Sequence, residues 1–530
     1  MLEKYISHRA IYLFFLIVLL FGLSMGKIFM SIGTIGISIN WLLEGGFHQK
    51  LNRLKELKWA PFILSLLFIL HVIWIINTKT EINKKTFDFL LIKFPLFCIP
   101  IVIGTSEFFN KKELKILLRA FFTGLILSTL ISIMIYFDIL HPKERTGDFR
   151  ELSRFIHHIR YSLLISISII ITLYLVLNTN IKEKKWLIIV MCWLFLMLLF
   201  IPSMTGMAAC LIAVSIIIVS NKNNFSRSFY YIGYLWVLGL ILISFYTCFI
   251  ISGFYQIKDE CDLSNLQERS INGEKYIHNT NDLRTENGYF VWINIAPNEC
   301  KRSWNSVSNY DFESKDKKGQ ALKFTLYRYL SSKGLTKDSI GMSFLSKNDI
   351  IKIENGKTTS INYNGIENRI REILLEIELF LDKGEANRHS VSQRVIFLKA
   401  GLLAFKKNFW LGVGPGGIKD EISKQYEFIS QDFEEETKKK GVHNQFLTLL
   451  ITFGAPGFIL FLIALIYPII FLKKKIRPLY IAFSLIIVIG FLSDDMLDRQ
   501  AGVAIFIVIN SILLFAIEKK DQSILGGSKV

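Results

Sequence analysis

Residues 159–177 read IRYSLLISISIIITLYLVL, an apolar run whose single charged residue, Arg160, lies at its start. A helix of about 20 such residues is long enough to cross the hydrocarbon core of a membrane. Similar runs recur along the chain, whose 530 residues are 52% hydrophobic and include 44 Phe. This exceeds what the core of a soluble domain needs, so the sequence predicts an all-α, polytopic membrane protein.

Twelve apolar stretches are expected to form transmembrane helices. They lie at residues 10–27, 29–45, 59–77, 87–105, 114–137, 159–177, 185–202, 204–221, 229–252, 444–472, 478–493 and 500–517. The segment between the ninth and tenth stretches is long enough to be a domain. The predicted organisation is an N-terminal bundle (1–252), a loop domain (253–442), C-terminal membrane helices (443–517) and a tail (518–530).

The orientation follows from the basic residues in the short loops, which favour the cytoplasmic side. These residues cluster in the loops at 46–58, 110–115, 178–185, 221–227 and 473–477. All five loops agree with one topology, in which both termini are cytoplasmic and the loop domain is extracytoplasmic. Part of the net charge of +18 is therefore a topology signal, and it does not indicate nucleic-acid binding.

Local patterns in the loop domain predict both helix and strand. Apolar residues recur at helical spacing over 365–384, and residues 323–330 predict a second helix ended by Lys333-Gly334. Residues 290–295 alternate as a strand does, and Asn355-Gly356 is typical of a turn. We therefore expect a large mixed α/β domain between spans nine and ten.

An apolar helix is expected to begin at Arg394 and to end at Lys406-Lys407. It is too short to span easily and is expected to lie in the membrane interface or across the bundle. The following residues, 412–417, read GVGPGG and literally satisfy a dinucleotide-binding glycine pattern. We interpret them as a turn, because no strand precedes them and Pro415 lacks an amide that a phosphate cradle would use.

The residues that we consider as candidates for catalysis or substrate binding lie on the predicted outer face. His443 lies where the loop domain meets the tenth span, Arg160 begins the sixth span, and Asp494 and Asp495 follow the eleventh. Each has a structural alternative, since arginine and histidine also anchor helices at the interface and acidic residues in turns are usually solvated. Cys261 and Cys300 can pair if their compartment is oxidising, and no cysteine spacing predicts a metal site.

Three motifs in order resemble the O-antigen ligase and polymerase superfamily. They are Arg394 opening an apolar helix that leads to the glycines at 412–417, His443-Asn444 opening a span, and the glycine-bounded turn 453–457, FGAPG. The stretches 325–338 and 349–354 are also similar to a subgroup with an enlarged periplasmic loop. One feature departs from the family pattern, because 203–206 read SMTG where many relatives have an arginine.

The resemblance implies an integral-membrane glycosyltransferase of the bacterial inner membrane, with its catalytic face and large loop in the periplasm. Its donor would be a glycan on undecaprenyl diphosphate, and its acceptor lipid A-core or another glycan. His443 would activate the acceptor hydroxyl, and Arg394 would bind the diphosphate with Arg160 as a second contact. Asn444 and Asp495 are expected to support them. The reaction implied is inverting and uses no metal or other cofactor.

Physical chemistry favours the same roles for these residue types. Arginine neutralises a diphosphate leaving group, and a neutral imidazole can take the proton of an attacking hydroxyl. The acceptor stays open between lipopolysaccharide ligation, polymerisation of lipid-linked repeats and transfer to protein. A non-enzymatic transporter is the alternative from another class, but its spans would carry paired charges.

Overall fold

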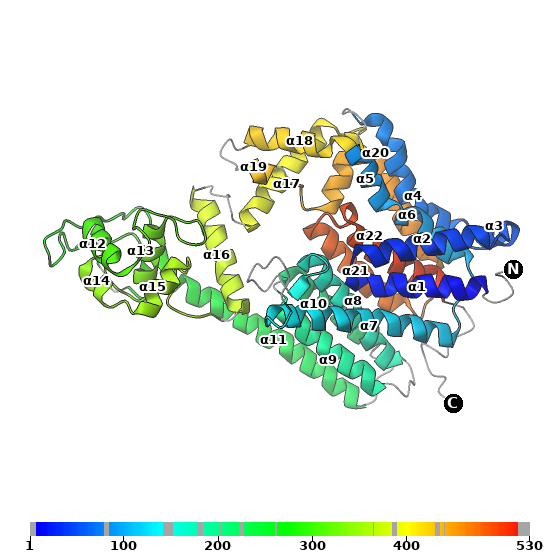
Figure 1. The fold of residues 1–530 in the computed structure, drawn as a ribbon, viewed down its shortest axis with the longest axis horizontal. Coiled ribbons are helices and arrows are strands. Elements are labelled where there is room, and N and C mark those ends of the chain that lie inside the picture. Colours follow the sequence, from blue (N-terminus) through cyan, green and yellow to red (C-terminus); the bar gives the residue numbers. More distant parts are fainter. Residues whose placement is uncertain are drawn as a thin grey trace. The chain divides into compact units, whose positions relative to one another are not determined.

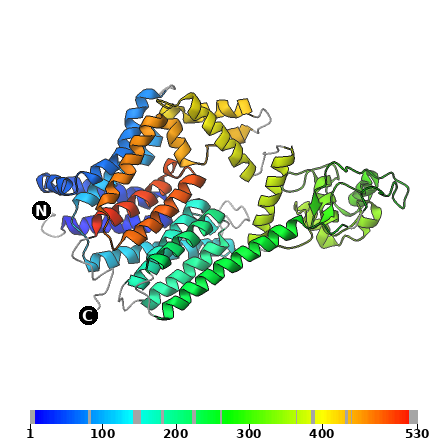
Figure 2. The same ribbon diagram turned by 180° about the vertical axis from the view of Figure 1, so that it is seen from behind.

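The computed structural model describes eleven segments of the chain. They are residues 7–78, 84–140, 152–178, 184–201, 203–221, 227–259, 262–363, 365–383, 390–429, 435–438 and 440–517. The chain divides into two compact units, one made of residues 1–233 and 385–530 and the other of residues 234–384 (Figures 1 and 2).

The first unit is a helical bundle in which each of the predicted apolar stretches within it forms helix. Its elements are α1 (His8–Met25), α2 (Lys27–Leu43), α3 (Phe47–Glu56), α4 (Ala60–Ile73), η2 (Trp74–Asn77), α5 (Lys84–Lys93), α6 (Pro95–Thr105), α7 (Lys111–Tyr136), α8 (His158–Asn178), α9 (Lys184–Phe200), α10 (Met204–Ser220), α17 (Ser390–Lys407), α18 (Gly414–Ile429), α19 (Glu435–Lys438), α20 (Gln445–Ile466), η5 (Tyr467–Phe471), α21 (Arg477–Ser493), η6 (Met496–Asp498), α22 (Gln500–Ser511) and the π-helical turn η7 (Ile512–Ala516). The ninth stretch forms α11 (Arg227–Tyr255), which runs from this unit into the second.

Within the described residues, seven helical segments are long and apolar enough to cross a membrane. The bent pair α2–α3, which turns by 111°, makes an eighth if it counts as one span. Three further apolar helices are shorter, at Met204–Ser220, Arg477–Ser493 and Gln500–Ala516. The structure is thus that of an α-helical membrane protein, and the expected number of twelve spans stays a prediction.

Helix α8 lies at the centre of the bundle, with 83% of its apolar window buried. Its serines allow close packing, because their hydroxyls bond to backbone carbonyls of their own helix, as in Ser162 to Ile159. Ser162 also donates to Ser203, which caps α10, and a side chain at Gly206 would collide with Ser162. The SMTG turn therefore joins α10 to α8, which gives it a structural role where the family pattern has an arginine.

Contacts between distant loops agree with the predicted grouping of the loops into two sides. Arg9 pairs with Glu113 at 2.7 Å, and the Tyr174 hydroxyl donates to the carbonyl of Lys475; all four residues belong to the predicted inner side. On the other side, the indole of Trp74 donates to the carbonyl of Leu411. Each of these three contacts joins residues that the charge pattern puts on the same side, and the topology of the remaining loops stays a prediction.

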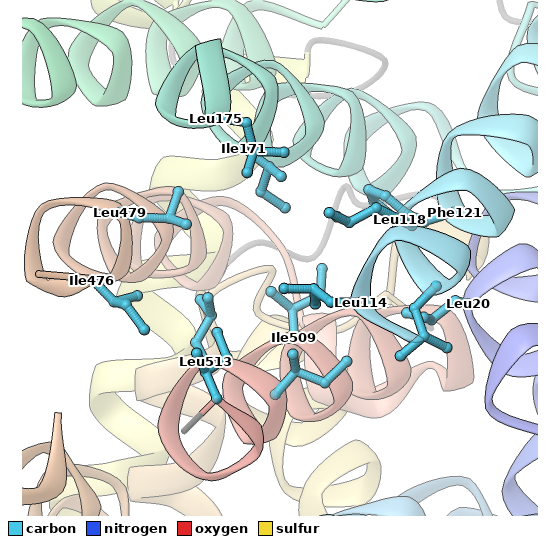
Figure 3. A pocket seen from close by; sticks show the side chains of 13 residues that line it. Leu20, Leu114, Leu118, Phe121, Ile171, Leu175, Ile476, Leu479, Ile509 and Leu513 are labelled. Atoms are coloured by element: carbon cyan, nitrogen blue, oxygen red, sulfur yellow. The ribbon is translucent and has the colours of Figure 1, made fainter. Parts of the chain in front are cut away.

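An apolar cavity of about 80 Å³ lies between α1, α7, α8, α21 and the α22–η7 segment (Figure 3). Its labelled side chains point toward a common space, among them Leu114 from α7, Leu175 from α8 and Leu513 from η7. These three come from the first turn of α7, the last turn of α8 and the final segment after α22. The cavity is therefore at the predicted inner end of the bundle.

The second unit contains a compact subdomain that is mainly helical. It holds the hairpin β1 (Thr285–Glu286) with β2 (Tyr289–Phe290), and the helices α12 (Pro297–Val307), α13 (Leu322–Ser332), α14 (Ser339–Ser343), α15 (Lys347–Glu354) and α16 (Gly365–Lys383). Its core packs around Trp304, Tyr329 and Leu330, all fully buried. The predicted helices at 323–330 and 365–384 and the turn at Asn355-Gly356 are confirmed.

The expected strand at 290–295 is wrong beyond its first residue. Its alternation does reflect burial, since Val291, Ile293 and Ile295 are buried, but Asn294 adopts a left-handed backbone with φ of 53°. A left-handed residue interrupts the regular pairing of a strand. The subdomain therefore has far less sheet than the mixed α/β domain expected from the sequence.

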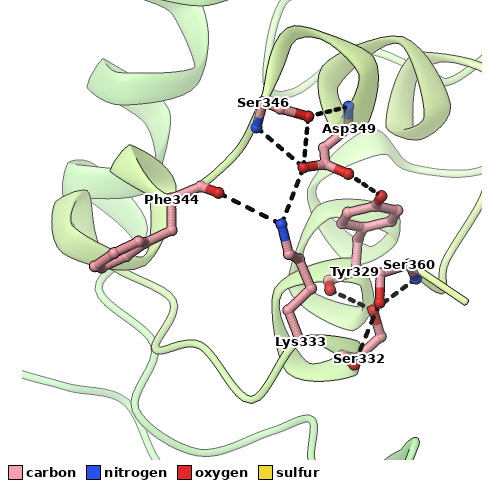
Figure 4. A network of polar contacts seen from close by, with 7 residues as sticks. All are labelled: Tyr329, Ser332, Lys333, Phe344, Ser346, Asp349 and Ser360. Carbon is pink, nitrogen blue, oxygen red and sulfur yellow. Dashed lines mark hydrogen bonds and ion pairs between the residues drawn. The ribbon is translucent and has the colours of Figure 1, made fainter.

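A polar network ties α13 to α15 (Figure 4). Asp349 accepts hydrogen bonds from the Tyr329 hydroxyl at 2.5 Å and from Lys333 at 3.0 Å, and it caps α15 together with Ser346. Burial opposes the charge on Asp349, but these hydrogen bonds outweigh it and hold the pKa of the carboxyl well below its usual range. The network is thus satisfied and structural.

The two units divide the chain differently from the predicted domain boundaries. Helices α17 and α18, predicted as part of the loop domain, pack against α20 in the membrane unit. Cys300 is buried in the second unit, while Cys261 lies outside the described residues, as does the predicted tail.

Candidate functional site

His443 lies in the short connection before α20 and adopts a backbone that non-glycine residues rarely take, with φ of 54°. Its amide donates a hydrogen bond of 3.0 Å to Asp495, which holds it in this conformation. Its ring packs on the buried ring of Phe397 from α17, with centroids 5.6 Å apart. The imidazole is nevertheless 37% exposed, so a substrate can reach it.

Asp494 lies between His443 and Arg160. Its Oδ1 is 3.8 Å from His443 Nδ1, and its Oδ2 is 2.5 Å from an Arg160 guanidinium nitrogen. Asp494 is only 4% exposed, and such burial raises a carboxyl pKa, yet the neighbouring imidazole and guanidinium reverse this and lower the pKa of Asp494. The side chain is therefore a buried carboxylate shared by a histidine and an arginine.

Asp495 is held differently from its neighbour. Its Oδ1 accepts from the Thr448 hydroxyl at 2.6 Å, and its Oδ2 accepts from the His443 amide. Burial, followed by repulsion from the Asp498 carboxylate, raises the pKa of Asp495 to about 6, although the Thr448 hydrogen bond and His443 oppose this rise. Burial and different charged neighbours thus shift the pKa values of two adjacent carboxyls in opposite directions.

Arg160 is buried in the first turn of α8, and one of its hydrogen-bond donors has no partner among the described residues. Its side chain is 10% exposed, and among the described residues its Nε is buried without a hydrogen-bond partner. Buried donors are nearly always paired in folded proteins. One nitrogen of the guanidinium thus faces Asp494, and the buried Nε is a donor that the described residues leave unsatisfied.

Arg394 lies on α17, the helix whose Phe397 packs on the ring of His443. It is exposed, and it lies three residues before Phe397, which puts it one helical turn from the ring that packs on His443. The neighbouring Gln393 accepts a hydrogen bond from Lys440, three residues before His443. The structure thus brings together His443, Asp494, Asp495 and Arg160, which we call the site cluster, and carries Arg394 to its vicinity.

Asn444 has a structural task at the start of α20. Its side chain accepts from the amide of Leu447 at 3.0 Å, so it is the N-cap of the helix. The next residue, Gln445, is fully buried and accepts from the amide of Leu497 at 2.7 Å. Asn444 therefore fixes the start of the helix that follows His443, and its expected supporting role at the site stays a prediction.

Comparison with known families adds a finding at this point. Residues 340–462 match the model of a family described as O-antigen ligase. This segment of the chain, less than a quarter of its 530 residues, is similar to the O-antigen ligase family. The match includes Arg394, His443 and Asn444, and it supports the superfamily resemblance predicted from the motifs. Among curated proteins no sequence matches this chain.

Three residues of the site cluster lie outside the matched segment. Arg160 comes from α8, and Asp494 and Asp495 follow α21, so helices before and after the matched segment complete the cluster. The family match supports an enzyme of the O-antigen ligase or polymerase type. A carboxylate near Nδ1 favours the imidazole tautomer that leaves Nε2 free to accept a proton.

Residues 494–498, which we call the acidic loop, contact a buried lysine of the bundle, Lys93. The sequence analysis did not single out this lysine. Lys93 is fully buried, and its Nζ lies 2.7 Å from Asp498 and donates to the carbonyl of Leu497 at 2.9 Å. A lone lysine inside a predicted span was the available signal, because intramembrane charges are rare and usually paired. Its partner was 405 residues away in sequence.

Two glycines of the matched segment allow close contact between the chain after α17 and the middle of α20. Gly412 and Gly454 both have positive φ, and a side chain at either would collide with the backbone of the other segment. The amide of Val413 donates to the carbonyl of Ile451, and the amide of Ala455 donates to that of Phe409. Of the expected turn at 412–417, only Gly412 and Val413 lie outside helix, because residues 414–417 begin α18. Gly412 packs against the break in α20.

Proposed function

We propose that this protein transfers a glycan from undecaprenyl diphosphate to the hydroxyl of lipid A-core, as an O-antigen ligase does. The observation that carries the proposal is the site cluster, in which an accessible imidazole lies beside a buried carboxylate and an arginine with an unsatisfied donor. These are the groups that an acceptor hydroxyl and a diphosphate leaving group require.

In the proposed reaction, the acceptor oxygen attacks the anomeric carbon while His443 Nε2 takes its proton. The bond between that carbon and the diphosphate oxygen breaks, and undecaprenyl diphosphate leaves with the electron pair. Attack from the face opposite the leaving group inverts the anomeric configuration. The donor bond stores the required energy, so the reaction as proposed uses no nucleotide.

Arg160 and Arg394 are proposed to bind the diphosphate. Guanidinium groups form paired hydrogen bonds with phosphate oxygens and neutralise the charge that develops as the bond breaks. Arg160 is fixed by Asp494, so its geometry is set before substrate arrives. Arg394, which is exposed on α17, is the more accessible of the two.

The proposed location is the bacterial inner membrane, with the site cluster and the second unit facing the periplasm and both termini in the cytoplasm. The basic loops 46–58 and 473–477 support this orientation, because short basic loops remain in the cytoplasm. Lipid-linked donor and lipid A-core acceptor would then meet at the outer surface of this membrane.

The experiment that tests the substrate class is a deletion strain whose glycolipids are separated by gel electrophoresis. The proposal predicts core without attached glycan, while polymer accumulates on the lipid carrier. Plasmid-borne wild-type protein should restore the full ladder. Core bearing a single repeat would instead indicate a polymerase, and an unchanged ladder would contradict both.

A further inference from the structure

The apolar cavity of Figure 3 is a feature that the proposed reaction does not use. Every residue that lines it is apolar, with Ile171 and Leu175 from α8 and Ile476 and Leu479 from the start of α21. Arg160 and Asp494 lie at the other ends of these two helices. The cavity is therefore remote from the site cluster.

The size and chemistry of the cavity suit part of a hydrocarbon chain. About 80 Å³ is smaller than the cavity of about 150 Å³ that accommodates benzene in an engineered protein. An apolar cavity stays dry, and its lining atoms lose dispersion contacts unless an apolar group fills it. In a membrane protein the abundant apolar groups are the acyl chains of the surrounding lipids.

The backbone beside the cavity departs from regular α-helix. The last turn before the described C-terminus is π-helical over Ile512–Ala516, and Ile512 and Leu513 from this turn line the cavity together with Ile517, which follows it. The carbonyl of Ala516 accepts a hydrogen bond from the amide of Phe109, which draws the turn toward the start of α7. A π-helical turn is rare and is frequently found at functional sites.

Basic residues close in sequence to the cavity lining at this end form what we call the basic rim. Ile476 is a lining residue, and its neighbours in sequence are Lys475 and Arg477. The full set at this end is Lys111, Lys112, Lys115, Lys473, Lys474, Lys475 and Arg477. Lys112, Lys474 and Arg477 are exposed, while Glu113 in the same turn is engaged by Arg9. The rim is therefore positively charged.

We propose that this cavity and its basic rim form a binding site for an anionic phospholipid. One acyl chain enters between α7, α21 and η7, and the phosphate lies against Lys474 and Arg477. Basic pockets between transmembrane helices bind anionic headgroups, and the predicted cytoplasmic leaflet is where such lipids are enriched. Neither part of the site depends on the proposed glycosyl transfer.

The test is a lipid titration of the delipidated full-length protein, followed by native mass spectrometry. Dioleoyl phosphatidylglycerol should bind at least about tenfold more tightly than the phosphatidylcholine with the same chains. The double substitution Lys474→Gln with Arg477→Gln should remove this preference, because it removes rim charge and leaves the cavity intact. Leu513→Trp should weaken binding of both lipids by filling the cavity.

Matched controls separate the site from a general effect of charge or bulk. Lys55→Gln with Lys58→Gln removes two positive charges from another loop on the predicted inner side, and Leu130→Trp adds bulk on an exposed part of α7. Both controls should keep the wild-type preference. Equal binding of the two lipids by the wild type, or a charge variant that keeps the preference, would overturn the proposal. Retention of a polyprenyl phosphate in place of phospholipid would do the same.

Discussion

At the residue scale, Asp494 connects the two groups on which the proposed chemistry depends. It is buried, it contacts an Arg160 nitrogen at 2.5 Å, and it lies 3.8 Å from His443 Nδ1. A carboxylate in this position fixes the arginine and stabilises positive charge on the imidazole during proton transfer. The sequence analysis considered this pair of aspartates but assigned only Asp495 to the site.

Arg160→Lys should lower transfer by about 100-fold while the protein remains folded in the membrane. A lysine keeps the charge but is a point donor, so it cannot contact Asp494 and a diphosphate with separate nitrogens. The measurement is transfer by purified protein at saturating and limiting donor. Arg154→Lys, at an exposed arginine just before α8, is the matched control and should be fully active. Full activity of Arg160→Lys would contradict a diphosphate-binding role.

Asp495→Asn should change how the stability of the protein depends on pH. The pKa of Asp495 is raised from 3.8 to about 6, so the folded state binds its proton more tightly than the unfolded chain. Its contribution to stability is therefore present at low pH and is lost as pH rises from about 4 to about 6. The pKa difference corresponds to at most about 3 kcal/mol.

Thermal unfolding in detergent between pH 4 and pH 7 measures this effect. The melting temperature of the wild type should fall as the pH rises from about 4 to about 6, because the contribution of protonated Asp495 is lost. Asp495→Asn should not show this fall. Asp494 has a lowered pKa and acts in the opposite sense, but its charge is one of the causes that raise the pKa of Asp495, so Asp494→Asn should reduce the Asp495 contribution without removing it. Identical pH profiles for the wild type and Asp495→Asn would show that the Asp495 pKa is not raised.

At the element scale, the acidic loop is the piece that completes the site. Lys93 forms an ion pair with Asp498 and donates a hydrogen bond to the carbonyl of Leu497. The side chain of Gln445 accepts a hydrogen bond from the amide of Leu497. Met496 and Leu497 are fully buried, so the loop enters the bundle instead of forming a solvated turn. This insertion is what brings Asp494 and Asp495 to His443.

Lys93→Met should destabilise the protein more than the double substitution Lys93→Met with Asp498→Leu. Removing one partner of a buried ion pair leaves an uncompensated charge and costs about 3–5 kcal/mol, whereas replacing both partners is often nearly neutral. Melting temperatures of the two variants and the wild type provide the comparison. Lys55→Met, at an exposed lysine on α3, should be neutral. A single variant as stable as the double variant would contradict the role of this pair.

At the scale of the whole molecule, sequence patterns predicted the helices well and their associations poorly. Each apolar stretch forms helix because length and hydropathy are local properties. The insertion of the acidic loop depends on Lys93 and Asp498, which are 405 residues apart, and no local pattern encodes such a pair. Likewise, α17 reads as part of the loop domain, but Phe397 packs on His443 at the start of α20.

For the candidate site, too, the residue types could be read from the sequence, but the contacts between separate helices could not. His443, Arg160 and Asp495 were predicted from residue type and position, and the family match at 340–462 supports the motifs that contain His443 and Arg394. The left-handed backbone at His443 and the shared position of Asp494 could not be predicted, because both arise from contacts between separate helices.

The central claim is that His443 takes the proton of the acceptor hydroxyl. It is tested most directly by transfer from a lipid diphosphate-linked glycan by purified His443→Ala, with His48→Ala, an exposed histidine on α3, as control. The account predicts that His443→Ala loses at least about 100-fold in rate while its melting temperature and donor binding stay near those of the wild type. Transfer by His443→Ala at the rate of His48→Ala would contradict it.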